Sequence, residues 1–91
     1  MQITTHNPPT VSVGSHVQIR DVESNERESY TLTRPGEADI RRHCISTLSP
    51  MGKALYGKSP GDIVEVDAPG GLLLVEVEAV EHVPSWEFVQ Q

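Results

Sequence analysis

The stretch LSPMGKALYGKSPGDIVEVDAPGG, residues 48–71, decides the fold because it contains a helix start, a helix stop, a strand and a tight turn in succession. Ser49 is a preferred N-cap residue, and Pro50 suits the first helical position, where its missing N–H costs nothing. Gly57 suits the left-handed conformation that ends many helices. The stretch therefore predicts a helix of about two turns that begins at Pro50. Such a short helix is marginal by itself, so we expect it to lie on a sheet.

The expected helix has one apolar face, formed by Met51, Ala54 and Leu55 at helical spacing. Beyond it, Pro60 and Gly61 turn the chain and DIVEVD alternates valine with acidic residues, as in a half-buried strand. The turn APGG, residues 68–71, then leads into LLLVEVEAVEH. Alternation in this last strand predicts an inner face with four apolar residues and an outer face with Glu76 and Glu78. The four inner residues are Leu73, Val75, Val77 and Ala79.

An earlier pair of strands is predicted upstream of the helix. Val13, Val17 and Ile19 alternate with polar residues, ESNE at residues 23–26 supplies a turn, and RESYTLTR resumes the alternation. PGEADIRRHC, residues 35–44, reads as a surface connection into a short extended piece at residues 44–47. The order strand, strand, helix, strand, strand indicates an α+β domain with an antiparallel sheet covered by one short helix.

The length of 91 residues and the hydrophobic content of 36% allow one small domain with a modest core. We expect a lead-in over residues 1–10, a domain over residues 11–83 and a tail over residues 84–91. In the tail, packing of Trp86 and Phe88 on an open edge of the core is favoured over a role as partner-binding anchors.

No apolar run reaches the roughly 20 residues that a membrane helix needs, and the N-terminal sequence MQITTHNPPT lacks the features of a signal peptide. A single cysteine, Cys44, fits a reducing compartment. These features predict a cytoplasmic protein without a membrane partner, and we expect a monomer.

The charge distribution is uneven. The net charge of −6 argues against direct binding to nucleic acid, which normally requires clustered cations. All seven Lys and Arg residues precede position 59, and the Asp and Glu residues that follow it have no Lys or Arg to balance them. The sequence leaves two interpretations open: two solvated faces, or a docking surface oriented by charge in which Arg41, Arg42, Lys53 and Lys58 form a basic side.

Catalytic and metal-binding patterns are not found in the sequence. The four histidines are scattered, and Cys44 has no partner pattern for a nucleophile. The carboxylates of the last two strands have the alternation of any exposed sheet face. We therefore expect no catalytic residue, no metal site and no cofactor.

ISTLSPMGKALYGKSPGDIVEVDAPGG, residues 45–71, resembles the C-terminal domain of the bacterial Gre transcript-cleavage factors. Their motif runs I-S, S-P, a small residue, A-L, G-K, G-D, a V-x-V strand and a P-G-G turn. Upstream, VGSHVQIRD, ESYTL and EAD extend the similarity, so it covers residues 11–83. The resemblance implies a fold similar to the FK506-binding proteins, a small curved antiparallel sheet with one short helix.

The resemblance also implies a partner. In Gre factors this domain docks at the rim of the RNA polymerase secondary channel, against a coiled coil of the largest subunit, and the Ser-Pro helix start belongs to the docking surface. The resemblance therefore implies a partner-binding surface at the helix start. With the basic residues added, the predicted contact set is Ser49, Pro50, Met51, Gly52, Lys53, Arg41 and Arg42.

One departure from the Gre pattern affects the expected activity. Gre factors stimulate cleavage through acidic residues at the tip of a long N-terminal coiled coil, and the ten residues before Val11 contain no such pattern. A short-armed relative, the Rnk group of nucleoside diphosphate kinase regulators, is also similar. The leading hypothesis is a non-enzymatic module that binds RNA polymerase and modulates elongation without stimulating cleavage. The alternatives are a peptidyl-prolyl isomerase, which the few aromatic residues make less favoured, and an interaction domain for another protein.

Overall fold

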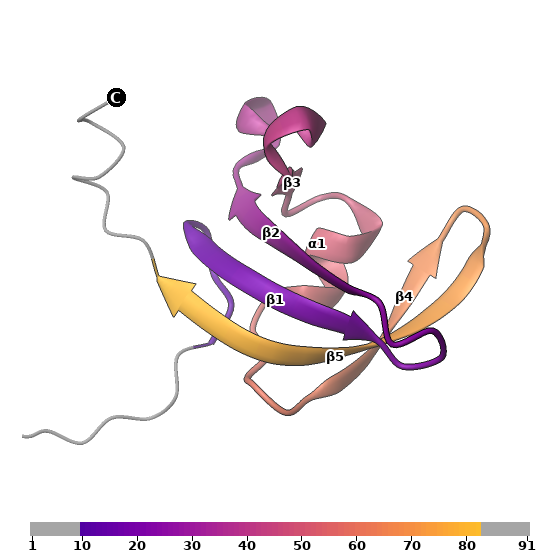
Figure 1. Cartoon of the computed structure of the whole chain (residues 1–91). Helices are drawn as coiled ribbons and strands as arrows, with labels where there is room; N and C mark the ends of the chain where they lie inside the picture. The colour runs from indigo at the N-terminus through magenta and orange to yellow at the C-terminus, as the bar shows by residue number, and fades with distance from the viewer. Residues whose placement is uncertain (1–9, 83–91) are drawn as a thin grey trace, which may run out of the picture.

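The computed structural model describes residues 10–82, in which five strands form one curled sheet and one short α-helix packs inside the curl (Figure 1). The predicted tail, with Trp86 and Phe88, and residues 1–9 of the predicted lead-in lie outside the described residues. The strands are β1 (Ser15–Asp21), β2 (Arg27–Thr33), β3 (Cys44–Ser46), β4 (Ile63–Ala68) and β5 (Gly71–His82). The helix is α1 (Pro50–Leu55), and two 3₁₀ turns are η1 (Pro35–Glu37) and η2 (Ile40–Arg42).

The sheet has the strand order β3-β2-β1-β5-β4 and is mixed. The β1–β2 and β4–β5 hairpins are antiparallel, as predicted, and β1 joins them by pairing antiparallel with β5. In contrast, β3 lies parallel to β2 with Thr31 opposite Cys44. The parallel pair arises because residues 34–43, with η1 and η2, carry the chain back before β3 begins, whereas a tight turn would have reversed it. The α+β prediction is confirmed, with one parallel pair added to the expected antiparallel sheet.

The predicted helix and its boundaries are confirmed. Ser49 is the N-cap of α1, Pro50 is its first residue, and Gly57 has a φ of 82°, which glycine adopts without steric cost. Leu55 is fully buried, and Met51 and Ala54 pack partly buried against the core. The six-residue helix is therefore held by its apolar face rather than by its own hydrogen bonds.

A β-bulge in β5 changes the face on which its last residues lie. Gln18 of β1 pairs with Ala79 and the next residue, Ile19, pairs with Val77, so Glu78 is the extra residue. As a result Ala79 is exposed and Val80 is buried, at 7% of its accessible surface. The prediction that Ala79 faces the core was wrong because strict alternation does not hold across a bulge.

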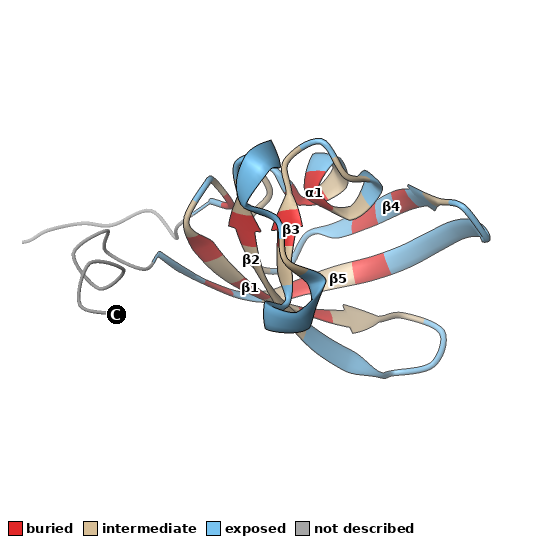
Figure 2. Cartoon of the chain, turned by 90° about the horizontal axis from the view of Figure 1, so that it is seen from above, coloured by how far each residue is buried: buried red, intermediate tan, exposed pale blue. Residues whose placement is uncertain are grey.

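The core lies between the concave face of the sheet and α1 (Figure 2). Val17 and Ile19 occupy it as predicted, but Val13 is exposed in a turn and Val11 is buried in its place. The segment around Val11 is fixed by a hydrogen bond from its N–H to the Lys58 carbonyl (2.9 Å). No helix within residues 10–82 has the length and apolar content needed to cross a membrane. The buried apolar residues are Val11, Val17, Ile19, Leu32, Ile45, Leu55, Val64, Val66, Val75, Val77 and Val80.

Candidate functional site

A hydrogen-bonded corner forms where β3 leads into α1. The Ser49 hydroxyl donates to the Ser46 carbonyl oxygen (2.7 Å) and accepts from the Gly52 N–H (3.0 Å). The Ser49 N–H also donates to the Ser46 carbonyl (3.0 Å), and the Leu48 N–H donates to the Ser46 hydroxyl (2.8 Å). The Ser49 side chain thus satisfies one of the free N–H groups at the helix start and ties that start to the end of β3.

Gly52 allows the helix to approach β3 closely. A Cβ atom at this position would lie 1.9 Å from the Ser46 carbonyl oxygen, and Gly52 itself is buried. Gly52 therefore acts in packing, and it is not available as a contact for a partner, contrary to the sequence-based prediction. Pro50 and Lys53 are exposed and Met51 and Ser49 are partly buried, so the rest of the predicted helix start reaches the surface.

An apolar groove of about 240 Å³ opens beside this corner. Pro50 and Met51 form one side of it, and Ile40 of η2, which is 75% exposed, lies at its edge. Residues far apart in the sequence meet here because the sheet curls around α1 (Figure 1). Residues of β2, η2 and the β4–β5 hairpin therefore line the same groove. The lining residues are Tyr30, Ile40, Ile45, Ser49, Pro50, Met51, Val66, Ala68, Pro69 and Leu73.

A smaller hollow of about 110 Å³ adjoins the groove and shares three lining residues with it, Tyr30, Met51 and Leu73. Its other apolar residues are Ile19 and Val75, both buried. The remaining lining residues are three carboxylates, Asp21, Glu26 and Glu28. The concave face is therefore apolar at the helix start and acidic toward the β1–β2 turn.

Tyr30 lies at the junction of the two hollows. Its hydroxyl donates to the Glu28 carboxylate (2.6 Å), and its ring lies 5.9 Å from that of His43, which bonds through Nδ1 to the Ser29 carbonyl. Burial raises the pKa of the Tyr30 hydroxyl to about 12, and the hydrogen bond to Glu28 acts in the same direction. At neutral pH the hydroxyl is therefore a permanent donor that holds Glu28 in place.

The predicted basic residues are not gathered into one patch. Arg41 and Arg42 are exposed on η2, next to Ile40 at the edge of the groove. Lys53 lies on the other side of Pro50, where it borders a separate hollow of about 280 Å³. Glu65 and Asp67 of β4 border that same hollow, so Lys53 faces acidic neighbours. None of the four predicted cations lines the groove, and Arg41 and Arg42 are connected to it through Ile40, which they follow directly in η2.

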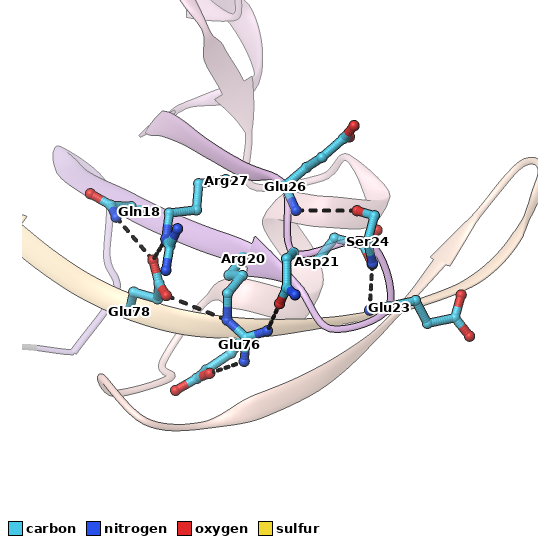
Figure 3. Close-up of polar contacts among 10 residues, drawn as sticks. Gln18, Arg20, Asp21, Glu23, Ser24, Glu26, Arg27, Glu76 and Glu78 are labelled. Atoms are coloured by element: carbon cyan, nitrogen blue, oxygen red, sulfur yellow. Dashed lines mark hydrogen bonds and ion pairs between the residues drawn. The ribbon is translucent and has the colours of Figure 1, made fainter.

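Two other arginines are neutralised on the outer face of the sheet (Figure 3). Arg20 pairs with Glu76 (2.5 Å) and approaches Glu78 (3.4 Å), while Arg27 pairs with Glu78 (2.9 Å). Hydrogen bonds from Arg27 and then from Gln18 lower the pKa of the Glu78 carboxyl. The predicted division into a basic and an acidic part therefore does not hold here, because strand pairing joins cations and carboxylates from the two ends of the chain.

Candidate metal ligands do not cluster in the part of the chain that the structure describes: no three His, Cys, Asp or Glu side chains there are placed to hold an ion. His16 contacts the Thr31 hydroxyl (3.0 Å), and the Cys44 thiol lies 3.7 Å from the Arg42 carbonyl. Both side chains therefore make contacts within the fold.

Seven of the ten residues that line the groove were not in the predicted contact set, and three of them, Tyr30, Ile40 and Leu73, show why. Tyr30 and Leu73 looked like ordinary inward-facing strand residues. Ile40 carried the one usable signal, an isolated apolar residue between charged neighbours in ADIRR, residues 38–42, but its place beside Pro50 depends on the curl of the sheet.

Comparison with known proteins shows which family this sequence matches. Residues 6–82 match the family described as "Transcription elongation factor, GreA/GreB, C-term". The chain is 44% identical over 77 residues to the transcription elongation factor GreA of Acidiphilium cryptum, an alignment that covers 85% of this chain and 49% of that protein. It is 46% identical over 70 residues to GreA of Nitratidesulfovibrio vulgaris (strain Miyazaki F), covering 77% of this chain and 44% of that protein. The chain thus spans about half the length of the curated relatives it matches.

Solved structures with the same fold include the GreA factor homolog Gfh1 of Thermus thermophilus, with a TM-score of 0.72 and 34% identity over 87% of this chain and 53% of that chain. The GreA/GreB elongation factor of Nitrosomonas europaea has a TM-score of 0.69 and 36% identity, covering 85% of this chain and 64% of that one.

Proposed function

Because this chain belongs to the GreA/GreB family of transcription elongation factors, as a match to their C-terminal domain, we propose that it binds bacterial RNA polymerase in the cytoplasm and modulates elongation. The observation that carries the proposal is the apolar groove beside the Ser49–Pro50 corner. The sequence pattern that identifies the family also builds this corner, and the corner places Pro50 and Met51 at the groove.

The proposed docking surface is the groove with its exposed edges. Ile40, Pro50 and Met51 supply apolar contact area, and Arg41 and Arg42 add positive charge at one edge. The two hydrogen bonds of the Ser49 hydroxyl fix the corner, so the surface is formed before a partner arrives. Binding then requires little additional ordering of the chain. The proposed partner element is the coiled coil of the largest subunit at the secondary-channel rim, and the chain would bind it as a monomer.

Two exposed isoleucines provide a matched test of this surface. Ile40 is 75% exposed at the groove, and Ile63, at the start of β4, is 59% exposed and does not line the groove. Ile40→Ser should weaken binding to purified core polymerase about tenfold, which is within the range for loss of a buried apolar contact. Ile63→Ser should bind like the original chain. Equal binding by both variants would exclude the groove as the docking surface.

A second part of the proposal concerns transcript cleavage. In Gre factors cleavage depends on acidic residues at the tip of a coiled coil, and these 91 residues contain no heptad repeat. We expect this chain to leave a backtracked complex uncleaved and, at high concentration, to reduce cleavage by a full-length GreA that uses the same rim. Shortened transcripts that depend on this chain alone would contradict this part without affecting the binding proposal.

The isomerase alternative is not favoured by the groove. Among residues 10–82, Tyr30 is its only aromatic lining residue, whereas a ligand pocket of that kind is usually rich in aromatic side chains. A coupled proline-peptide assay with no turnover above background is the expected result. Binding to another protein in place of polymerase would support the second alternative, an interaction domain with a different partner.

A further inference from the structure

We propose that the smaller hollow binds a Lys or Arg side chain of the partner, on the same segment whose apolar side chain occupies the groove. This inference rests on the proposed function and adds the chemistry by which the partner is selected. It is carried by the shape, the lining and the charge of the hollow.

The smaller hollow has an apolar floor and an acidic rim. Ile19, Val75 and Leu73 supply the floor, and the carboxylates of Asp21, Glu26 and Glu28 supply the rim. Lys and Arg side chains commonly bury their methylene stems along apolar surface and keep the charged head beside water or a carboxylate. Hydrogen bonds from such a cation to carboxylates are about twice as strong as neutral ones. The lining therefore fits a long cationic side chain better than an aliphatic one.

The acidic rim is not neutralised by the protein itself. Strand alternation sends Arg20 and Arg27 to the outer face of the sheet, where they pair with Glu76 and Glu78 (Figure 3). No Lys or Arg among residues 10–82 is within ion-pair distance of the three rim carboxylates. A cation from a partner would therefore meet carboxylates that form no ion pair within the described chain, although Arg20, which pairs with Glu76, also attracts Asp21 at longer range.

Two of the three rim carboxylates are also held in place by hydrogen bonds. Glu28 accepts the Tyr30 hydroxyl (2.6 Å), and Asp21 accepts the backbone N–H groups of Glu23 (2.8 Å) and Ser24 (3.2 Å). Because these bonds orient the carboxylates before binding, the free energy of binding a cation is reduced less by the cost of ordering the site.

The two hollows share Tyr30, Met51 and Leu73, so their occupants lie next to each other. On a helix, side chains three or four positions apart point the same way and lie about 5–6 Å apart at Cβ. A helical segment with an apolar residue and a Lys or Arg one turn away could fill both hollows at once, in the helix-in-groove manner. The acidic rim also fixes the direction of that segment, with its cationic end toward the β1–β2 turn.

The test uses the double variant Glu26→Gln and Glu28→Gln, in which the amide oxygen introduced at position 28 can still accept the Tyr30 hydroxyl. Its dissociation constant from purified core polymerase should rise about tenfold at low ionic strength, and the difference should shrink at high salt.

The control double variant is Glu23→Gln and Glu81→Gln, which changes the net charge equally. Glu23 lines neither hollow and points away from the Arg20 network, and Glu81 borders a different hollow with His16 and Ala79. The control should bind like the original chain at both salt concentrations.

Equal binding by the rim variant and the original chain would overturn the cation site while leaving the proposed function intact, provided that Ile40→Ser still weakens binding. The same loss in rim and control variants would also overturn it, because net charge alone would then explain the effect. A chain that does not bind polymerase at all would overturn the proposed function and this inference together. Urea denaturation of each variant checks that the fold is retained.

Discussion

The carbonyl oxygen of Ser46 lies against Gly52, 1.9 Å from where a Cβ atom on that glycine would be. This contact joins the end of β3 to the first turn of α1, and it sets how deeply the helix start lies in the curled sheet. Everything that we propose about the docking groove depends on this approach, because Pro50 and Met51 are placed by it.

Gly52→Ala should destabilise the domain. Alanine favours a helix by about 1 kcal/mol over glycine, but the added methyl group would have to displace β3 backbone, and such overpacking typically costs about 1–3 kcal/mol. At a separation of 1.9 Å the steric term should prevail, so urea denaturation should show a lower free energy of unfolding. Gly36→Ala, where a Cβ would meet nothing within 4 Å, is the control and should change stability little. If Gly52→Ala left the free energy of unfolding unchanged, β3 and α1 would not be in close contact.

Ser49 needs a hydroxyl and not only a capping acceptor. From the sequence alone, Asp at this position would be expected to cap the helix equally well. In the structure the Ser49 hydroxyl also donates to the Ser46 carbonyl at 2.7 Å, and a carboxylate would repel that oxygen. We therefore expect Ser49→Asp to lower thermal stability, by an amount similar to the roughly 1–2 kcal/mol expected for Ser49→Ala. Ser49→Thr, which keeps both hydrogen bonds, should be closest to the original chain. A stable Ser49→Asp variant would show that the bond to Ser46 contributes little.

The β5 bulge makes opposite predictions for two adjacent residues. Val80 is buried and Ala79 is exposed, although strict alternation from Val75 and Val77 would place Ala79 inside. Val80→Ala should cost about 1–3 kcal/mol of stability through lost apolar burial, while Ala79→Ser should cost less than about 0.5 kcal/mol. Chemical denaturation of both variants measures this. The reverse order of effects would mean that β5 has no bulge at this point.

Acid should remove the stabilising effect of Glu78. Its pKa is lowered by hydrogen bonds from Arg27 and Gln18, so the stabilisation is complete above the ordinary glutamate pKa of about 4.3 and is lost as the pH falls through the lower folded-state value. The original chain should be more stable than Glu78→Gln at pH 7, and the difference should close below about pH 4. Added salt should reduce the difference at pH 7, since these groups are close to solvent. Glu65→Gln is the control, because Glu65 is exposed and forms no ion pair within residues 10–82. A difference for Glu78→Gln that does not vary with pH would contradict the ion-pair network.

Tyr30 should make the fold less stable as the pH rises, whereas Glu78 does so as the pH falls. A pKa raised to about 12 means that the folded state keeps the phenolic proton longer than the unfolded chain, whose tyrosine pKa is about 10. Stability should therefore fall as the pH rises from about 10 toward 12, and Tyr30→Phe should reduce that slope. Circular dichroism during urea titration at several alkaline pH values measures it. The same slope in both proteins would indicate that Tyr30 is not held against Glu28.

Local features of the structure could be predicted from the sequence because they depend on residues close together in the chain. Ser49, Pro50 and Gly57 determined where α1 begins and ends, since capping and φ preferences act over a few residues. The alternation of Val64 and Val66 determined the buried face of β4. The motif in residues 45–71 was enough to identify the family, and the match over residues 6–82 confirms it.

Tertiary structure decided the features that depend on residues far apart in the chain. The parallel pairing of β3, the bulge opposite Gln18, and the pairing of Arg20 with Glu76 follow from how the strands meet, and no local pattern encodes them. The candidate site is of this kind as well. Ile40 and Pro50 share a groove only because the sheet curls around α1, and Gly52 is buried only because β3 passes beneath it. Local propensities fix the elements of this domain, whereas burial and strand pairing fix the surface that those elements form together.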